Sequence, residues 1–298
     1  MNVIETAGLS KAYGRSWALM DCTLRIPEGC LAALVGPNGA GKTTLMNMVA
    51  GLAVPTAGEV TVLGGFPAGS PRALNSVAFV AQDAPVYKNL SVSDMIHLTR
   101  NLNRRFDVAY ATARMDELGI PLKRKSGKLS GGQQSQLALT LALARKPRLL
   151  ILDEPLAALD PLARQDFMAT VMTAMADDGV SVLLSSHAVA DLERFTDFLI
   201  VLSGGTPQAM GETDDLIAEH RLLSGPAEEA DRIAELLRVV EIRRAAALAH
   251  VLVRISDPGD RVPLGWEAHQ VTVGELVLSY LRAQRKSFSP ERAPVTRK

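Results

Sequence analysis

The chain has 298 residues, 47% hydrophobic and 21% charged, and its 32 basic residues balance 32 acidic ones. This composition is typical of a soluble globular protein with one large and one small domain, and zero formal net charge argues against wholesale nucleic-acid binding. No apolar run approaches the ~20 residues that cross a bilayer, and the N-terminus has no apolar signal core, so no membrane span is expected.

The N-terminal region predicts short strands over residues 3–26, with a turn at Tyr13-Gly14-Arg15. Tyr13 by itself is typical of a half-buried aromatic at a strand end. The two cysteines, Cys22 and Cys30, lack metal-ligand spacing and fall in strand-like segments. They are interpreted as core residues of a protein in a reducing cytosol.

A glycine-rich loop with the sequence GPNGAGKTT occupies residues 36–44, after an apolar strand at 31–35 and before a helix that should end near Gly51. It matches the GxxxxGK[ST] pattern of a phosphate-binding loop. Its glycines permit positive φ and close backbone approach, so successive N–H groups can surround an anion at a helix N-terminus. Lys42 would supply a cation for the β- and γ-phosphates and Thr43 a hydroxyl ligand for magnesium. The pattern predicts a nucleotide-phosphate site without identifying the kind of ATPase.

The next part of the chain changes from strands to helices. A turn at 55–58 precedes a strand at 59–63, and a strand at 77–80 leads to Gln82 and a loop at 83–85. A glutamine after a strand is usually only solvated. Helices are predicted at 92–104, at 108–118 and after Gly131, so residues from about 84 to 146 are interpreted as a helical insert.

The third of these helices follows the sequence Leu129-Ser130-Gly131-Gly132-Gln133. The ordinary interpretation is a flexible turn with an N-capping serine. Two glycines and a serine at a helix start also form a second anion-binding terminus. Because one nucleotide should not need two such termini from one subunit, the surplus indicates a site shared between subunits.

Three polar groups follow strands in the next segment. A wholly apolar strand at 149–152, typical of a parallel sheet, ends in Asp153 and Glu154. Residues 157–161 lead into a helix to about Ala176, and a strand at 180–184 ends at 185–187, where a further helix should begin. The carboxylates could form a solvated turn and His187 could cap or pack, but ligands bind at the carboxyl edge of an α/β sheet.

The remaining residues predict a last strand of the large domain at 198–202, then a short helix at 214–219. A turn at Gly225-Pro226, a helix at 227–237, strands at 239–242 and 251–255, and a helix at 273–281 follow. The domains are therefore placed at 1–220 and 221–284, the second a small α+β unit. Residues 285–298, rich in Lys, Arg, Ser and Pro, are expected to form a frayed tail.

In this order the motifs resemble the ATP-binding subunits of ABC transporters over about residues 3–215. The resemblance identifies Tyr13 as the adenine-stacking aromatic, residues 36–44 as Walker A, Gln82 as the Q-loop and residues 129–133 as the signature. It also identifies residues 149–155 as Walker B with its catalytic glutamate, 157–160 as the D-loop and His187 as the switch histidine. LSGGQ between a Q-loop and Walker B is the most diagnostic.

The resemblance implies an α/β fold: a P-loop NTPase core with an antiparallel β subdomain, an inserted helical subdomain and the C-terminal α+β appendage. It assigns nucleotide binding to Tyr13, Gly36, Pro37, Asn38, Gly39, Ala40, Gly41, Lys42, Thr43, Thr44, Ser130, Gly131, Gly132, Gln133 and Asp160. It assigns catalysis to Lys42, Gln82, Glu154 and His187, with Glu154 as general base. Magnesium would be held by Thr43, Gln82 and Asp153, the last directly or through water.

The implied assembly is a head-to-tail dimer with a second ATP-binding subunit, identical or different, in which each ATP lies between Walker A of one subunit and the signature of the other. Transmembrane permease subunits would dock near Gln82 and the helical insert, which places the protein at the cytoplasmic face of the cell membrane. Because residues 271–277 loosely resemble the closing segment of exporter-type subunits, export is preferred over import. The cargo cannot be read from this chain.

Two departures from the family pattern are visible. Residues 134–136 are Gln-Ser-Gln where basic residues are usual, and the D-loop has Ala where many members have Ser; neither change removes a phosphate ligand. The competing functions are a soluble regulatory ATPase on ribosomes or DNA and a non-catalytic binding module. The single head without a coiled coil or zinc motif argues against the first, and intact Lys42, Glu154 and His187 argue against the second.

Overall fold

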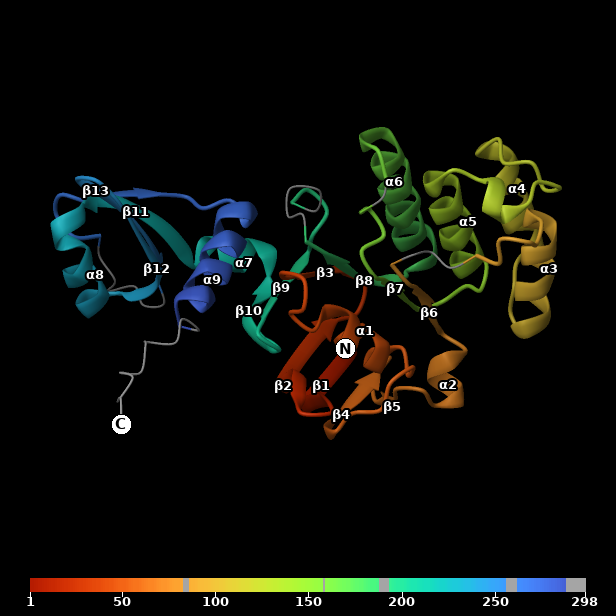
Figure 1. The fold of residues 1–298 in the computed structure, drawn as a ribbon, viewed down its shortest axis with the longest axis horizontal. Coiled ribbons are helices and arrows are strands. Elements are labelled where there is room, and N and C mark those ends of the chain that lie inside the picture. The colour runs from red at the N-terminus through yellow and green to blue at the C-terminus, as the bar shows by residue number, and fades with distance from the viewer. Residues whose placement is uncertain (83–85, 158, 188–192, 256–261, 288–298) are drawn as a thin grey trace, which may run out of the picture.

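The computed structural model describes residues 1–82, 86–157, 159–187, 193–255 and 262–287. Their elements form three sheets, with the helical insert at one end of an elongated molecule and the C-terminal sheet at the other (Figure 1). Within these residues, no helix is both long and apolar enough to cross a membrane.

The central sheet has the strand order β10-β9-β3-β8-β7-β6, in which only the edge pair β10–β9 is antiparallel. Its strands are β3 (Leu31–Val35), β6 (Val77–Val80), β7 (Leu149–Leu152), β8 (Ser181–Ser186), β9 (Phe198–Ser203) and β10 (Thr206–Glu212). Every residue of β3, β7, β8 and β9 is buried, as expected for parallel strands covered on both faces. The P-loop NTPase core predicted from the motifs is therefore present.

A second sheet is antiparallel, in the order β2-β1-β4-β5. It comprises β1 (Asn2–Tyr13), β2 (Ser16–Pro27), β4 (Ala57–Val62) and β5 (Phe66–Pro67). Helix α1 (Lys42–Val49) shares one apolar core with this sheet and with β3. The expected short N-terminal strands are instead two strands of 12 residues each, because register shifts in their pairing let the hairpin continue past irregular positions.

The helical insert has an apolar core of its own, centred on Val92, Ile96, Met115 and Leu137. Its helices are α3 (Val92–Leu102), α4 (Val108–Glu117), the 3₁₀ turn η1 (Ser126–Lys128) and α5 (Gly131–Leu143). A short helix, α2 (Pro71–Leu74), precedes β6. The predicted loop at 83–85 lies outside the described residues.

The C-terminal sheet has the order β12-β13-β11-β14 and is antiparallel. Its elements are β11 (His220–Pro226), η3 (Ala227–Glu229), α8 (Ala230–Leu236), β12 (Arg238–Ala245), β13 (Leu248–Arg254), β14 (Glu267–His269) and α9 (Val273–Ser287). Helix α9 links this sheet to the cassette, because Leu276 and Val277 join the core that contains Leu199 and Val201.

A buried histidine lies at the start of β11. The Nδ1 of His220 lies 2.6 Å from the carbonyl oxygen of Leu216 and its Nε2 lies 2.9 Å from the hydroxyl of Tyr280. Since a carbonyl only accepts, Nδ1 carries the proton and the tyrosine donates to Nε2. Burial lowers the pKa of His220.

Several sequence expectations are corrected at the C-terminal side. The strand at 198–202 is not the last of the large sheet, because β10 pairs with it. The turn expected at Gly225-Pro226 is instead the end of β11, held by pairing with β13. The predicted helix at 227–237 begins as the turn η3, and α9 extends to Ser287 into the predicted tail, because residues 282–286 favour helix.

The rest of that tail, residues 288–298, and the helix expected directly after His187 fall outside the described residues. The domain limits at 1–220 and 221–284 stay predictions. Helix α6 (Pro161–Asp178) follows β7 in the chain and precedes β8, and α7 (Thr213–Ala218) leads from β10 to β11.

Candidate functional site

The glycine-rich loop lies between β3 and α1, where two glycines are required by their surroundings. A Cβ on Gly36 would lie 2.2 Å from the carbonyl oxygen of Leu202, and a Cβ on Gly41 would lie 2.5 Å from that of Ala18. Gly39 and Gly41 have positive φ values of 80° and 102°. Gly36 is therefore needed for close backbone approach and not for positive φ.

This loop forms one wall of a hollow of about 450 Å³, within the range of ligand pockets. The hollow is lined by Tyr13, Ala18, Asn38, Gly39, Ala40, Gly41, Lys42, Thr43, Thr44, Gln82, Glu154 and His187. The fold thus brings together predicted residues from five separate parts of the sequence. Sequence reasoning missed Ala18, because a small apolar side chain within a strand gives no signal of a ligand site.

An ion pair lies inside this hollow. The Nζ of Lys42 is 3.1 Å from Oε1 of Glu154, and both side chains are buried. The same ammonium donates to the carbonyl oxygen of Gly36 at 2.7 Å. The other carboxylate oxygen of Glu154 lies 2.6 Å from Nδ1 of His187, whose side chain is 55% exposed. Glu154 therefore joins the phosphate loop to the predicted switch histidine.

The backbone at Glu154 is held in a strained conformation. Its φ is 49°, in the left-handed region that non-glycine residues rarely adopt. Its N–H donates to Oγ of Ser185 at 2.8 Å, and that hydroxyl donates to Oδ1 of Asp153 at 2.7 Å. Sequence reasoning missed Ser185; the available signal was a hydroxyl at the carboxyl end of an apolar strand, next to His187.

Other predicted residues lie at the edge of the hollow or away from it. Tyr13 is 55% exposed, and the Lys11 ammonium is 5.2 Å from its ring centroid. Gly36 and Pro37 support the loop without lining the hollow, and Asp153 is buried beside it. The exposed face of Tyr13 is open to a planar ligand.

The signature and D-loop residues do not meet the phosphate loop within one chain. Residues 130–133 and Asp160 do not line the hollow. Ser130 and Gln133 form a capping box at the start of α5, and Asp160 accepts from the N–H of Ala163 at the start of α6, at 2.9 Å. Ser130, Gly131 and Asp160 are exposed, while Ala158 of the D-loop lies outside the described residues.

Comparison with known proteins agrees with this geometry. The family described as "ABC transporter" matches residues 19–157. The thiamine import ATP-binding protein ThiQ of Shigella flexneri serotype 5b (strain 8401) is 32% identical over 204 residues, which cover 67% of this chain and 88% of that protein. The ABC transporter ATP-binding protein YtrB of Bacillus subtilis (strain 168) is 29% identical over 73% of this chain and 75% of its own length. The Fe(3+) ions import ATP-binding protein FbpC of Mesorhizobium japonicum is 34% identical over 72% of this chain and 62% of its own length.

Solved structures show the same likeness. One described as the ATP-binding subunit of an ABC transporter has a TM-score of 0.65 and 27% identity, over 72% of this chain and 92% of its own. A bacterial ABC transporter cassette solved as a dimer has a TM-score of 0.63 and 25% identity, over 70% and 98%. The chain therefore belongs to the ATP-binding subunits of ABC transporters and is an ATPase of that family.

Proposed function

We propose that the hollow binds ATP and Mg²⁺ and that ATP hydrolysis there powers transport through separate transmembrane permease subunits. The observation that carries this proposal is the meeting of Lys42, Glu154 and His187 in the hollow that the glycine-rich loop lines. The carboxylate proposed to act on water thus contacts both the cation proposed to bind phosphate and the imidazole.

Nucleotide binding is assigned to the loop and to Tyr13. The loop from Asn38 to Thr44 offers backbone N–H groups at the N-terminus of α1, where the helix dipole also favours an anion. Tyr13 would stack on the adenine at the outer edge of the same hollow. Phosphate oxygens that approach Lys42 compete with Glu154 for its ammonium, while the carbonyl of Gly36 continues to hold the side chain in place.

The residues around the loop also fit a magnesium ion. Thr43 and Gln82 offer oxygen atoms to the same hollow, and Asp153 lies directly beside Glu154, so the donor set is the oxygen-only kind that Mg²⁺ prefers. When bound, the ion would neutralise negative charge on the phosphates. Ser185 keeps one carboxylate oxygen of Asp153 engaged, which fixes the orientation of that side chain.

Glu154 is assigned as the general base that orients and deprotonates the attacking water. Its backbone strain and its hydrogen bond to Ser185 fix the direction of the carboxylate. His187 holds one carboxylate oxygen and would contact the γ-phosphate. Most of the protein's contribution to phosphoryl transfer is positioning and charge stabilisation, and these contacts supply both.

The active site is proposed to be shared between two cassettes. Residues 130–133 and Asp160 lie outside the hollow of their own chain, and several of them are exposed at helix N-termini. An opposing subunit, identical or different, would bring these residues to the nucleotide. A cassette described as dimeric among the similar structures supports this arrangement.

The partner subunits are proposed to be transmembrane permeases, which places this protein at the cytoplasmic face of the membrane. Relatives named for thiamine and Fe(3+) import do not support the export direction expected from the sequence, so the proposal gives no direction or cargo. The test is copurification of the tagged protein with a polytopic membrane protein, followed by magnesium-dependent ATP hydrolysis. Capture of ribosomes or DNA in place of a membrane protein would contradict the transport assignment.

A further inference from the structure

A second polar hollow of about 430 Å³ lies away from the nucleotide site. Four arginines line it together with Phe66: Arg72 from α2, Arg104 and Arg105 from the segment after α3, and Arg145 from the segment after α5. The sequence brings these residues from three regions that are far apart. Their convergence on one hollow is therefore a product of the fold.

In the part of the chain that the structure describes, no carboxylate pairs with the arginines of this hollow. None of the lining residues is acidic, and none of the ion pairs between described residues involves any of the four. Arg145 is half-buried, and its guanidinium donates to the carbonyl oxygen of Leu74, at 2.9 Å. The Arg72 guanidinium lies 5.6 Å from the Phe66 ring centroid. Arg72, Arg104 and Arg105 are exposed, so solvent screens the repulsion among the four cations only in part, and a bound anion would reduce it further.

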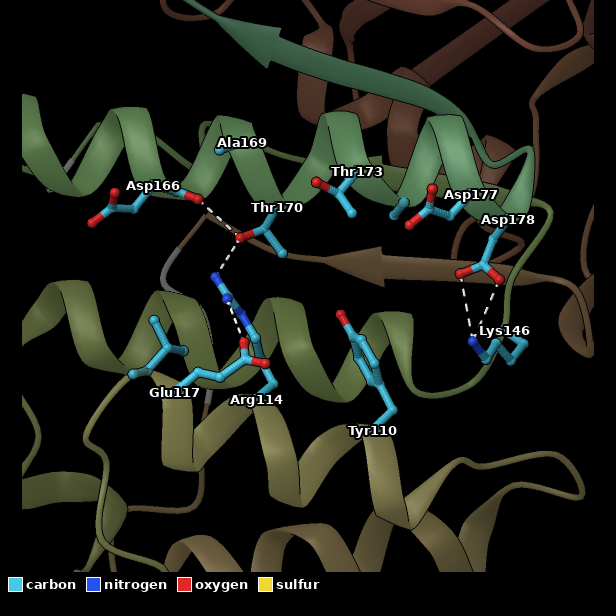
Figure 2. Close-up of a pocket in the computed structure, with 12 residues that line it drawn as sticks. Tyr110, Arg114, Glu117, Lys146, Asp166, Ala169, Thr170, Thr173, Asp177 and Asp178 are labelled. Atoms are coloured by element: carbon cyan, nitrogen blue, oxygen red, sulfur yellow. Dashed lines mark hydrogen bonds and ion pairs between the residues drawn. The ribbon is translucent and has the colours of Figure 1, made fainter.

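A hollow of about 680 Å³ between α4 and α6 shows the contrast (Figure 2). Its Lys146 lies 3.4 Å from Asp178, and its Arg114 lies 2.9 Å from Glu117 and donates to Thr170. Each cation there is balanced from within the chain. The hollow of about 430 Å³ differs, because no ion pair of the described residues balances the positive charge of its arginines.

We propose that the four-arginine hollow is a binding site for a small soluble organic phosphate that carries two or more negative charges. Guanidinium groups bind phosphate oxygens in pairs of parallel hydrogen bonds, and a single carboxylate would leave most of the positive charge uncompensated. Asn75 and Asn103 add neutral hydrogen-bonding groups for the organic part of the ligand. The volume is within the usual range for such ligands.

This site can be filled independently of the nucleotide hollow. Ser76 lines it at the start of β6, whereas Gln82 follows the other end of that strand. The two hollows therefore lie at opposite ends of β6, and a ligand in one need not block the other.

The test is calorimetric titration of the full-length protein with pyrophosphate, in saturating ADP and without divalent metal, so that the P-loop is occupied. The wild type should bind one pyrophosphate, and Arg104→Gln/Arg105→Gln should bind at least about tenfold more weakly, since two charge-assisted contacts are lost. Arg145→Gln is a second variant with the same expected direction. ATP turnover should stay within about twofold of wild type in all of them, so this test is independent of the proposed transport function.

The matched control is Arg25→Gln/Arg232→Gln, which removes two exposed arginines far from the hollow in sequence and leaves pyrophosphate affinity unchanged if the proposal is right. Absence of pyrophosphate binding to the wild type, or equal weakening in the control, would overturn it. Binding to phosphatidic acid vesicles that requires the arginines, without pyrophosphate binding, would assign the hollow to a lipid surface instead. Loss of a copurifying membrane subunit in the arginine variants, again without pyrophosphate binding, would make it a protein docking site.

Discussion

Glu154→Gln tests the proposed general base. The substitution keeps the shape of the side chain and removes the carboxylate charge that a base requires. Hydrolysis should fall by at least about 100-fold, the typical contribution of a general base. Nucleotide binding should survive, since the loop and Tyr13 are untouched. With hydrolysis blocked, magnesium-ATP should hold two subunits together as a dimer that size-exclusion chromatography detects.

The same substitution should also change stability in a way that the ion pair predicts. At 3.1 Å, the attraction between Lys42 and Glu154 is about 5 kcal/mol for an effective dielectric of ~20. Breaking a fully buried pair costs about 3–5 kcal/mol, but the hollow admits water and Lys42 keeps its bond to Gly36, so we expect a net loss of about 1–3 kcal/mol. Without nucleotide, the thermal midpoint should fall by about 2–4 °C for each kcal/mol lost.

Scanning calorimetry with and without magnesium-ATP measures this effect. Added nucleotide should raise the midpoint of the variant more than that of the wild type, because Lys42 no longer has to leave a carboxylate. Glu59→Gln is the matched control: Glu59 is exposed and takes part in no ion pair of the described residues, so turnover and midpoint should not change. Turnover within tenfold of wild type, or a parallel loss of nucleotide affinity, would refute the assignment of Glu154 as base.

Four further outcomes are expected. Tyr13→Ala should weaken ATP affinity by about 1 kcal/mol or somewhat more while turnover at saturating ATP changes little; equal affinity by equilibrium titration would mean that Tyr13 only packs. Mixed dimers of Lys42→Ala with Ser130→Arg should hydrolyse ATP well above either variant alone, because one of their two shared sites carries neither substitution. Activity of Ser130→Arg alone would refute the shared-site mechanism. Burial lowers the pKa of His220, so as pH falls the unfolded chain binds a proton at this residue before the folded chain does. The free energy of unfolding should therefore decrease below about pH 6.5, by at most about 1.4 kcal/mol per pH unit. Chemical unfolding of His220→Gln should show a weaker pH dependence. Burial raises the pKa of Cys30 to about 11. At pH 8 about 0.1% of this side chain should therefore be thiolate, whereas about a quarter of an unperturbed cysteine is thiolate at that pH. Dithionitrobenzoate should label Cys30 rapidly only after unfolding.

The candidate site could be predicted because its signals are local. The glycines of the P-loop, the apolar strand before Asp153 and the histidine at the end of β8 each combine a residue type with a strand end. In a parallel sheet those strand ends meet at one edge. Neighbouring strands therefore brought Lys42, Glu154 and His187 together in the structure, as the sequence order indicated.

Features that depend on tertiary pairing could not be predicted in this way. Strand β10 has no fully buried residue, and its apolar and polar residues alternate only weakly. It is a strand because it pairs with β9 at the edge of the sheet. The end of β11 at Pro226 has the composition of a turn, and pairing with β13 overrides it. The link from Ser185 to Asp153 joins residues 32 apart, and the four arginines come from separate segments, so neither leaves a periodic signal.

The geometry at Glu154 connects backbone strain, an ion pair and the proposed catalytic role in one network. A left-handed φ at a non-glycine residue costs on the order of 1 kcal/mol or more, and Ser185 offsets it by accepting the Glu154 N–H while holding Asp153. The result is a carboxylate fixed between Lys42 and His187. Phosphate oxygens that compete for the Lys42 ammonium would release Oε1 of Glu154 from its ion pair, while His187 still holds Oε2. The carboxylate oxygen proposed to act on the attacking water is therefore freed only when the nucleotide is in place.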